Sequence, residues 1–180
     1  SIAAGIRLAD LARWLGAGTP IVRAMPNRPA LIGAGITALY AGNGIAARDR
    51  EDVEALMSAA GSTVWLDQES QMDAVTAISG SGPAYFFLLI EALESAGVAS
   101  GLPAATARRL AIETARGARL MAAQGGETPA VLREQVTSRG GTTEAALQVL
   151  EAAAVSDTFR SAVAAAARRS AQLADEFGST

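Results

Sequence analysis

The chain has 180 residues, a net charge of −3, and an alanine-rich composition in which 50% of residues are hydrophobic and 4% aromatic. It contains no cysteine or histidine, and all 15 basic residues are arginine, which excludes disulfides, thiolate and Schiff-base nucleophiles, histidine bases and most zinc sites. The acidic balance argues against nucleic acid as a partner, and the absence of any run of about 18 apolar residues argues against a membrane span.

Alternating structure types are expected in the first third of the chain. Helix signals cover 6–15 and 49–60, the second beginning at a capping Asp49, and strand signals cover 20–25, 35–41 and 62–66. Strand, helix and strand in this order predict the end of an α/β sheet. The chain opens in a strand-like segment without a methionine or a charged leader, so we expect no secretory signal and expect residues to precede Ser1.

Helices alone are expected beyond about residue 67. Their signals cover 81–96, 103–124, 128–137, 142–154 and 156–177. Ser156 and Asp157 are expected to cap the last of them. The change of pattern predicts a boundary between a domain at 1–67 and an all-helical domain at 68–180.

The helix expected from Ala84 is apolar on almost every side, with the sequence Ala-Tyr-Phe-Phe-Leu-Leu-Ile over 84–90. A helix of this kind must be buried on most sides, and the other helices of one subunit would barely enclose it. We therefore expect a second subunit to cover part of it. The alternative is that it forms the central helix of a monomeric bundle.

The clearest candidate site is the segment 136–144, Val-Thr-Ser-Arg-Gly-Gly-Thr-Thr-Glu. Gly140 and Gly141 let a ligand approach the backbone closely. Thr142 or Thr143 is expected to cap the helix that follows. The first-turn amides of that helix lack intrahelical partners, and the helix dipole favours negative charge there. A carboxylate or phosphate would fit, with the nearby hydroxyl groups as further donors. The alternative is an ordinary capped helix after a Gly-Gly turn.

Two other segments have both a functional and a structural interpretation. Residues 78–85, Ile-Ser-Gly-Ser-Gly-Pro-Ala-Tyr, form either an anion cradle or a tight turn that packs two helices closely. Residues 23–29, Arg-Ala-Met-Pro-Asn-Arg-Pro, follow a strand end. Open α/β sheets bind ligands at such places, but the segment could equally be a proline-fixed connection.

Two matches to G-x-G-x-x-A begin at Gly33 and Gly42. Neither has a strand-turn-helix context, so we reject both as dinucleotide fingerprints. The arginine pairs on the polar helix faces are interpreted as solvated or interface residues. Arg139 is the exception, because it lies inside the candidate anion segment.

Three of these segments together resemble the pyrroline-5-carboxylate reductase family. Residues 132–151 resemble the signature segment of that family, residues 72–85 the entry to its dimerisation helix, and residues 23–27 its sheet-edge loop. The likeness extends from Ser1 to about Phe177. Three motifs in the correct order are more specific than any one of them alone.

The resemblance implies an α/β remnant of a Rossmann-type domain followed by an all-α helical dimerisation domain, mostly helical overall. It implies a cytoplasmic oxidoreductase of proline biosynthesis. Such an enzyme transfers a hydride from NADPH or NADH to the C5 carbon of pyrroline-5-carboxylate, and L-proline results. The expected macromolecular partner is a second copy of the chain, in an interlocked homodimer or an assembly of such dimers, without nucleic acid or membrane.

The resemblance also implies the site residues. The amides of the Gly-Gly-Thr-Thr helix start would hold the substrate carboxylate, and the Thr143 hydroxyl, the catalytic group, would contact the ring nitrogen. The predicted substrate-binding residues are Val136, Ser138, Gly141, Thr142 and Thr143. The predicted cofactor-binding residues are Ala24, Met25, Pro26 and Asn27. No metal is expected.

The chain departs from the family pattern in two ways. Arg139 stands where the family often has proline, and the glycine-rich nucleotide fingerprint would have to precede Ser1. We therefore expect that this chain alone does not bind the cofactor productively.

A protonated imine accepts hydride readily, so the reaction depends on the orientation of the two reactants and needs few acid–base residues. The alternatives are a β-hydroxyacid dehydrogenase, which would need a catalytic lysine, a non-enzymatic helical oligomerisation module, and a fragment inactive by itself.

Overall fold

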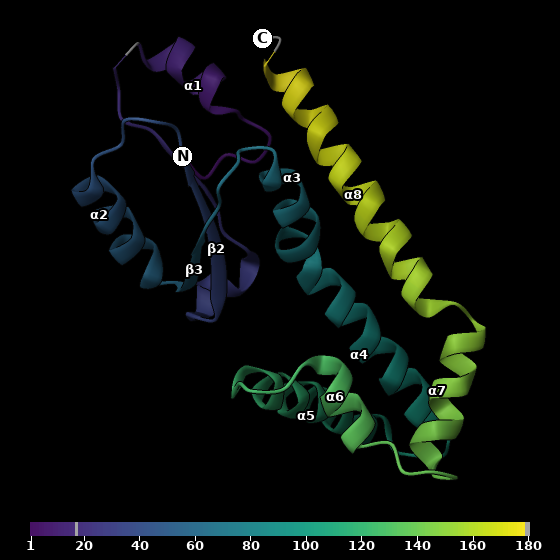
Figure 1. The fold of residues 1–180 in the computed structure, drawn as a ribbon. Coiled ribbons are helices and arrows are strands. Elements are labelled where there is room, and N and C mark those ends of the chain that lie inside the picture. The colour runs from purple at the N-terminus through teal and green to yellow at the C-terminus, as the bar shows by residue number, and fades with distance from the viewer. Residues whose placement is uncertain (17, 179–180) are drawn as a thin grey trace. The chain divides into compact units, whose positions relative to one another are not determined.

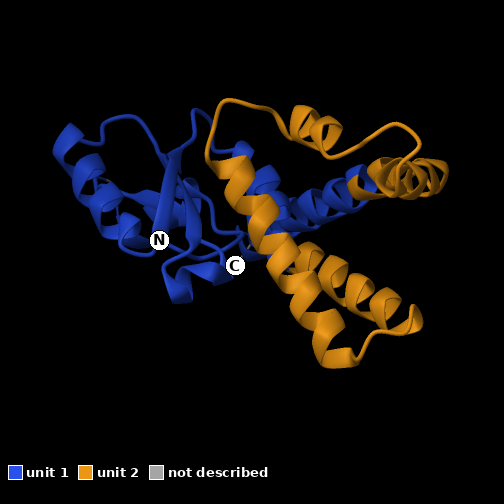
Figure 2. Cartoon of the chain, turned by 90° about the horizontal axis from the view of Figure 1, so that it is seen from below, with its two compact units in different colours: residues 1–83, 160–180 blue, residues 84–159 orange. Residues whose placement is uncertain are grey.

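The computed structural model describes residues 1–16 and 18–178 and is mostly helical, as predicted (Figure 1). The chain divides into two compact units (Figure 2). The first comprises Ser1–Pro83 together with the chain from Arg160 onward, and the second comprises Ala84–Phe159. Because contacts group the end of the chain with its beginning, the predicted division into 1–67 and 68–180 stays a prediction.

The first unit is built on a small sheet. Its elements are α1 (Leu8–Leu15), β1 (Val22–Met25), η1 (Arg28–Ile32), β2 (Gly35–Ala41), α2 (Ala47–Ser58), β3 (Gly61–Trp65), α3 (Gln71–Val75) and η2 (Thr76–Gly80). The helices and strands predicted over residues 6–66 are confirmed in type and order. The predicted cap of α2 is wrong: its N-cap is Ala46, and Asp49 lies in the first turn, where its charge complements the helix dipole.

The strand order is β1-β2-β3, with β1 antiparallel to β2 and β2 parallel to β3. Leu39 lies at the centre of this sheet. It is opposite Ala24 on one side and Trp65 on the other, and it is 0% exposed. Val53 and Met57, four residues apart on one face of α2, pack against this core. The apolar centre of β2 therefore holds α2 and both neighbouring strands.

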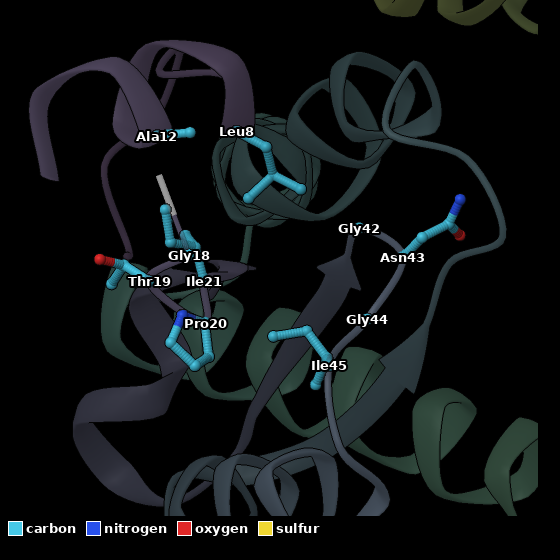
Figure 3. Close-up of a pocket in the computed structure, with 10 residues that line it drawn as sticks. All are labelled: Leu8, Ala12, Gly18, Thr19, Pro20, Ile21, Gly42, Asn43, Gly44 and Ile45. Carbon is cyan, nitrogen blue, oxygen red and sulfur yellow. The ribbon is translucent and has the colours of Figure 1, made fainter. Parts of the chain in front are cut away.

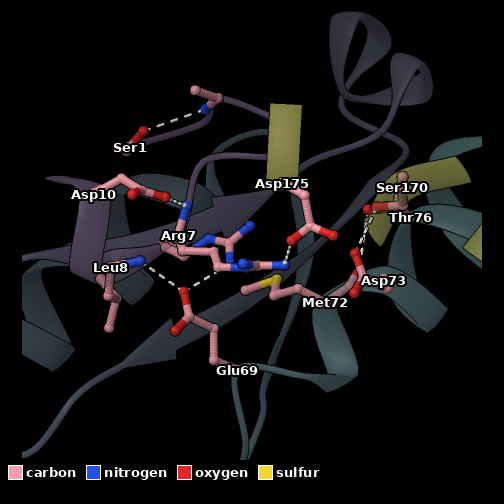
Figure 4. A network of polar contacts seen from close by, with 12 residues as sticks. Ser1, Arg7, Leu8, Asp10, Glu69, Met72, Asp73, Thr76, Ser170 and Asp175 are labelled. Atoms are coloured by element: carbon pink, nitrogen blue, oxygen red, sulfur yellow. Dashed lines mark hydrogen bonds and ion pairs between the residues drawn. The ribbon is translucent and has the colours of Figure 1, made fainter. Parts of the chain in front are cut away.

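Charged side chains fasten the elements around this sheet (Figure 4). Glu69 Oε1 accepts hydrogen bonds from the Leu8 amide and from Arg23 NH1, both at 2.7 Å. The Arg23 side chain is 11% exposed, so this ion pair is partly withdrawn from water. Asp175 accepts a hydrogen bond from Arg7 at 2.6 Å, which raises the pKa of Arg7 above its ordinary value. The last turns of the C-terminal helix are thereby joined to the start of α1.

A continuous helical stretch, Gln71–Ala99, replaces the turn or cradle predicted at 78–85. Its segment η2 is a π-helix, in which Ser81 N donates to Thr76 O at 2.8 Å, five residues back. Pro83 accounts for this widening, because it lacks an N–H and its ring crowds the carbonyl four residues back. The hydroxyls of Thr76 and Ser79 support the wide turn by donating to carbonyls four residues back.

The remaining helices are α4 (Gly82–Ala99), α5 (Ala104–Ala123), α6 (Pro129–Gln135), α7 (Thr142–Ala152) and α8 (Val155–Gly178). The helices predicted beyond residue 67 are confirmed, with corrections at two starts. The N-cap of α7 is Gly141 rather than a threonine. The helix α8 begins at Val155, ahead of the predicted Ser156–Asp157 cap. Ala154 has a left-handed φ of 51°, which ends α7 and lets α8 begin at the next residue.

The apolar side chains in the first half of α4 are exposed to solvent in the single chain. Phe86, Phe87 and Leu88 are 65%, 63% and 65% exposed. The other helices of the second unit therefore do not cover these side chains. By length and composition alone, the stretch Gln71–Ala99 could also cross a membrane. The expectation that no segment spans a membrane therefore stays a prediction.

Candidate functional site

The candidate substrate loop, residues 136–143, comprises the connection between α6 and α7 and the first two residues of α7, all within the second unit. The first helical hydrogen bond of α7 runs from Ala145 N to Gly141 O at 3.2 Å. The amides of Thr142, Thr143 and Glu144 precede this bond, so they lie in the first turn, where amides point out of the helix end. Together with the helix dipole they favour a bound carboxylate.

One of the predicted donors is already engaged. Gly141 N donates to Ser138 O at 3.0 Å and closes a turn before α7. The amides of Thr142 and Thr143 are therefore better placed than that of Gly141 to receive a carboxylate. Ser138 also explains why residue 141 is glycine, because a Cβ there would overlap the Ser138 Oγ atom. The Ser138 hydroxyl therefore lies directly beside the start of α7.

Glu144 completes the loop, although our sequence reasoning did not single it out. Its Oε2 accepts a hydrogen bond from Gly140 N at 2.6 Å. Gly140 has a φ of +70°, a conformation that favours glycine. The available signal was a glutamate in the first turn after a small capping residue, as in a capping box. Its charge lies at the same helix end that a substrate carboxylate would use.

The other predicted substrate residues lie around this helix start. Thr143 is half-buried, whereas Ser138 and Arg139 are exposed. Val136 follows α6 and is 58% exposed, so it offers an apolar surface beside the polar loop. The loop thus presents hydroxyl groups and one exposed apolar side chain next to the start of α7.

The candidate nicotinamide loop, residues 24–27, spans the carboxyl end of β1 in the first unit. Ala24 is buried in the sheet and the next three residues are half-buried. Asn27 Oδ1 accepts a hydrogen bond from Ile36 N at 3.0 Å, and the Asn27 carbonyl accepts one from Ala30 N at 3.0 Å. The first bond ties the loop to the start of β2 and the second ties it to η1, so its shape is set before any ligand arrives.

The two loops belong to different units, and the residues of each are brought together within its own unit. None of the residues of the nicotinamide loop lines the cavity of about 420 Å³ whose lining residues are drawn in Figure 3. It is lined by α1, the residues before β1 and the turn after β2, which places it at the amino end of β1. Within residues 1–16 and 18–178, no cluster of three or more acidic side chains could hold a metal.

Comparison with known proteins places this geometry in a family. Residues 69–173 match a family model described as pyrroline-5-carboxylate reductase dimerisation. The chain belongs to the pyrroline-5-carboxylate reductase family. The matched range runs from the residues before α3 into α8, and it includes the whole substrate loop.

Curated pyrroline-5-carboxylate reductases resemble the chain over nearly its whole length. The enzyme of Pseudomonas aeruginosa is 50% identical over 178 residues, which cover 99% of this chain and 65% of the relative. The enzyme of Arabidopsis thaliana is 46% identical over 173 residues, which cover 96% of this chain and 62% of the relative. The chain therefore spans less than two thirds of the length of these relatives.

Solved pyrroline-5-carboxylate reductases share its fold. A structure from Coxiella burnetii is 40% identical with a TM-score of 0.93, covering 96% of this chain and 64% of its own. A structure from Plasmodium falciparum with NADP bound is 32% identical with a TM-score of 0.89, covering 97% of this chain and 70% of its own. The predicted fold class, a Rossmann-type remnant followed by a helical domain, is confirmed.

Proposed function

We propose that this chain carries the substrate-binding part of an NAD(P)H-dependent pyrroline-5-carboxylate reductase. The observation that supports this most directly is the start of α7, whose first-turn amides favour a carboxylate and which lies inside the range matched by the family model. In the reaction, a hydride adds to C5 of the protonated imine while the ring nitrogen keeps its proton. The products are L-proline and the oxidised nicotinamide.

Four residues of the substrate loop have a role in this proposal. The amides of Thr142 and Thr143 and the hydroxyl of Ser138 hold the substrate carboxylate. The Thr143 hydroxyl hydrogen-bonds to the ring nitrogen and orients the imine for attack at C5. Because the protonated imine is already electrophilic, orientation and proximity supply most of the acceleration. Val136 provides an apolar surface for the ring.

The nicotinamide cofactor supplies the hydride when it is bound. Residues 24–27 fit its nicotinamide end, because the bond between Asn27 and Ile36 holds this loop at the carboxyl end of β1. The two G-x-G-x-x-A segments do not fit its phosphates, since Gly35 begins a strand and Gly44 lies in a turn. We propose NADPH rather than NADH, because NADP is bound in the Plasmodium falciparum structure.

We also propose that two copies of the chain pair through α4. The exposed faces of Phe86, Phe87 and Leu88 are consistent with the family model, which describes a dimerisation domain. Lipid is a poorer cover for this helix, because Glu91 and Glu94 lie in its middle, and a carboxylate in a bilayer is costly. The cytoplasmic location of such an enzyme stays a prediction.

The test compares two proteins. One is the 180-residue chain, and the other, which we call the hybrid protein, joins this chain to the part of the Pseudomonas aeruginosa relative that it does not match. We expect the hybrid protein, but not the chain alone, to oxidise NADPH when pyrroline-5-carboxylate is added. A folded, dimeric hybrid protein that oxidises neither NADPH nor NADH would contradict the reductase and favour an oligomerisation module.

A further inference from the structure

Gly80, the last residue of the π-helix η2, lies against Met25 of the nicotinamide loop. A Cβ atom at residue 80 would be 2.9 Å from Met25 Cε and 3.7 Å from Thr76 Cγ2. Carbon atoms in contact prefer a separation of about 3.5–4.0 Å. The methyl group of Met25 therefore occupies the space that a side chain at residue 80 would need, and both residues belong to the first unit.

The backbone does not itself require glycine at this place. Gly80 has a helical conformation, whereas the glycines with positive φ lie elsewhere in the described chain. Glycine inside a helix is about 1 kcal/mol less favourable than alanine. The reason for a missing side chain at residue 80 is therefore the contact with Met25 and not the backbone conformation. Gly80 lies in the π-turn Thr76–Gly80, and π-turns are frequent at functional sites.

We propose that Gly80 is a positioning residue for the nicotinamide. Its missing side chain lets Met25 lie back against the helix, which keeps the face of the loop 24–27 clear for the nicotinamide ring. This inference rests on the proposed reductase function. Methionine is flexible, so a Cβ at residue 80 would displace the Met25 methyl group and leave the helix folded.

The placement of Met25 is tested on the 180-residue chain by NMR. The chain has four methionines, so a sample labelled at the methionine methyl carbons gives four assignable signals. We expect Gly80→Ala to shift the Met25 signal and to leave the Met57 and Met121 signals in place. Gly82→Ala is the matched control, because among the described atoms nothing lies within 4 Å of a Cβ there.

The functional consequence is tested on the hybrid protein. We expect Gly80→Ala to lower kcat/KM for the reduced nicotinamide by about tenfold, since ångström-scale misplacement costs up to about a hundredfold. The KM for pyrroline-5-carboxylate should stay within about twofold, because Gly80 acts on the nicotinamide side. The melting temperature should be unchanged or higher, given the greater helix propensity of alanine.

Shortening Met25 separates positioning from simple damage. With Met25→Ala in place, residue 80 has no methyl group to displace, so adding Gly80→Ala should change kcat/KM by less than about twofold. An equal loss in both backgrounds, an unshifted Met25 signal or a lowered melting temperature would overturn the positioning role. If the unsubstituted hybrid protein is inactive while the Met25 signal still shifts, the contact stands and the reductase function fails, taking the nicotinamide role with it.

Discussion

The carboxylate of Glu144 accepts a hydrogen bond from the amide of Gly140 at 2.6 Å, at the same helix start that is proposed to hold the substrate carboxylate. The interaction has two opposing effects. It fixes the Gly140 backbone, whose φ is +70°, and so shapes the loop. It also places a negative charge where a second one must bind, which weakens the attraction of the first-turn amides.

Replacing Glu144 by glutamine separates these effects. Glutamine keeps an oxygen that can accept from Gly140 N but carries no charge. We expect Glu144→Gln to lower the KM of the hybrid protein for pyrroline-5-carboxylate by about threefold, because charges at helix ends contribute about 0.3–1 kcal/mol. Glu144→Ala loses the hydrogen bond as well and should raise KM instead. A KM of the glutamine variant equal to that of the unsubstituted hybrid protein would show that the charge has no effect on binding, and equal KM values for the two variants would show that the hydrogen bond has none.

The role of the Thr143 hydroxyl is tested by two substitutions of similar size. Thr143→Val removes the hydroxyl and keeps the backbone amide, so the carboxylate contact survives while the ring nitrogen loses its partner. We expect kcat/KM for pyrroline-5-carboxylate to fall by about 10- to 100-fold, the cost of a hydrogen bond to a charged group. Thr143→Ser keeps the hydroxyl and should retain most of the activity. An unchanged kcat/KM for the valine variant would remove Thr143 from the proposed mechanism.

The ion pair between Glu69 and Arg23 is expected to stabilise the first unit. Its side chains are 28% and 11% exposed, and Glu69 also accepts from the Leu8 amide. Glu69→Ala removes the partner of the Arg23 guanidinium, which is largely withdrawn from water. We therefore expect the free energy of unfolding to fall by about 2 kcal/mol. Urea denaturation of the 180-residue chain measures this change.

A surface pair provides the control for this experiment. Arg48 and Asp52 are 89% and 73% exposed, and their closest atoms are 3.9 Å apart. Asp52→Ala should change the free energy of unfolding by less than about 0.5 kcal/mol, because exposed pairs are screened by solvent. If both alanine variants lose the same stability, burial of the Arg23 pair is not the reason for its effect.

The exposed face of α4 predicts the effect of a charge at the proposed subunit interface. Phe87 is 63% exposed within one chain, so Phe87→Glu should not disturb the fold of that chain. If a second copy covers this face, the variant should dimerise about 100-fold more weakly, since a charge buried without a partner is costly. Sedimentation analysis of the 180-residue chain measures the dissociation constant.

Leu56 supplies the matched control for the interface experiment. It is 72% exposed on α2, outside the family-matched range. Leu56→Glu should leave dimerisation unchanged. Equal dimerisation of the Phe87 and Leu56 variants would contradict an interface at α4, and binding of the unsubstituted chain to lipid vesicles would instead favour the membrane interpretation of this helix.

Local patterns predicted most of the elements and the position of the substrate loop. The strand β2 was predicted at its observed bounds, Gly35–Ala41, because apolar residues between glycines and a turn signal are a local feature. The N-cap of α7 was predicted within two residues from Gly-Gly-Thr-Thr, because hydroxyl residues after a glycine pair are a local signal of a helix start. The predicted roles of the site residues stay predictions.

Interactions between distant parts of the chain could not be read from these patterns. Arg23 and Glu69 are 46 residues apart, and Gly80 meets Met25 from 55 positions further along the chain. No local propensity specifies such pairs, because they depend on how the sheet and the helices pack. The π-turn before Pro83 is a similar case: the glycines and the proline predicted a turn or an anion cradle, whereas the helix continues through them with one widened turn. Residue types and spacing thus determined the elements and the chemistry available to them, and packing determined which atoms meet.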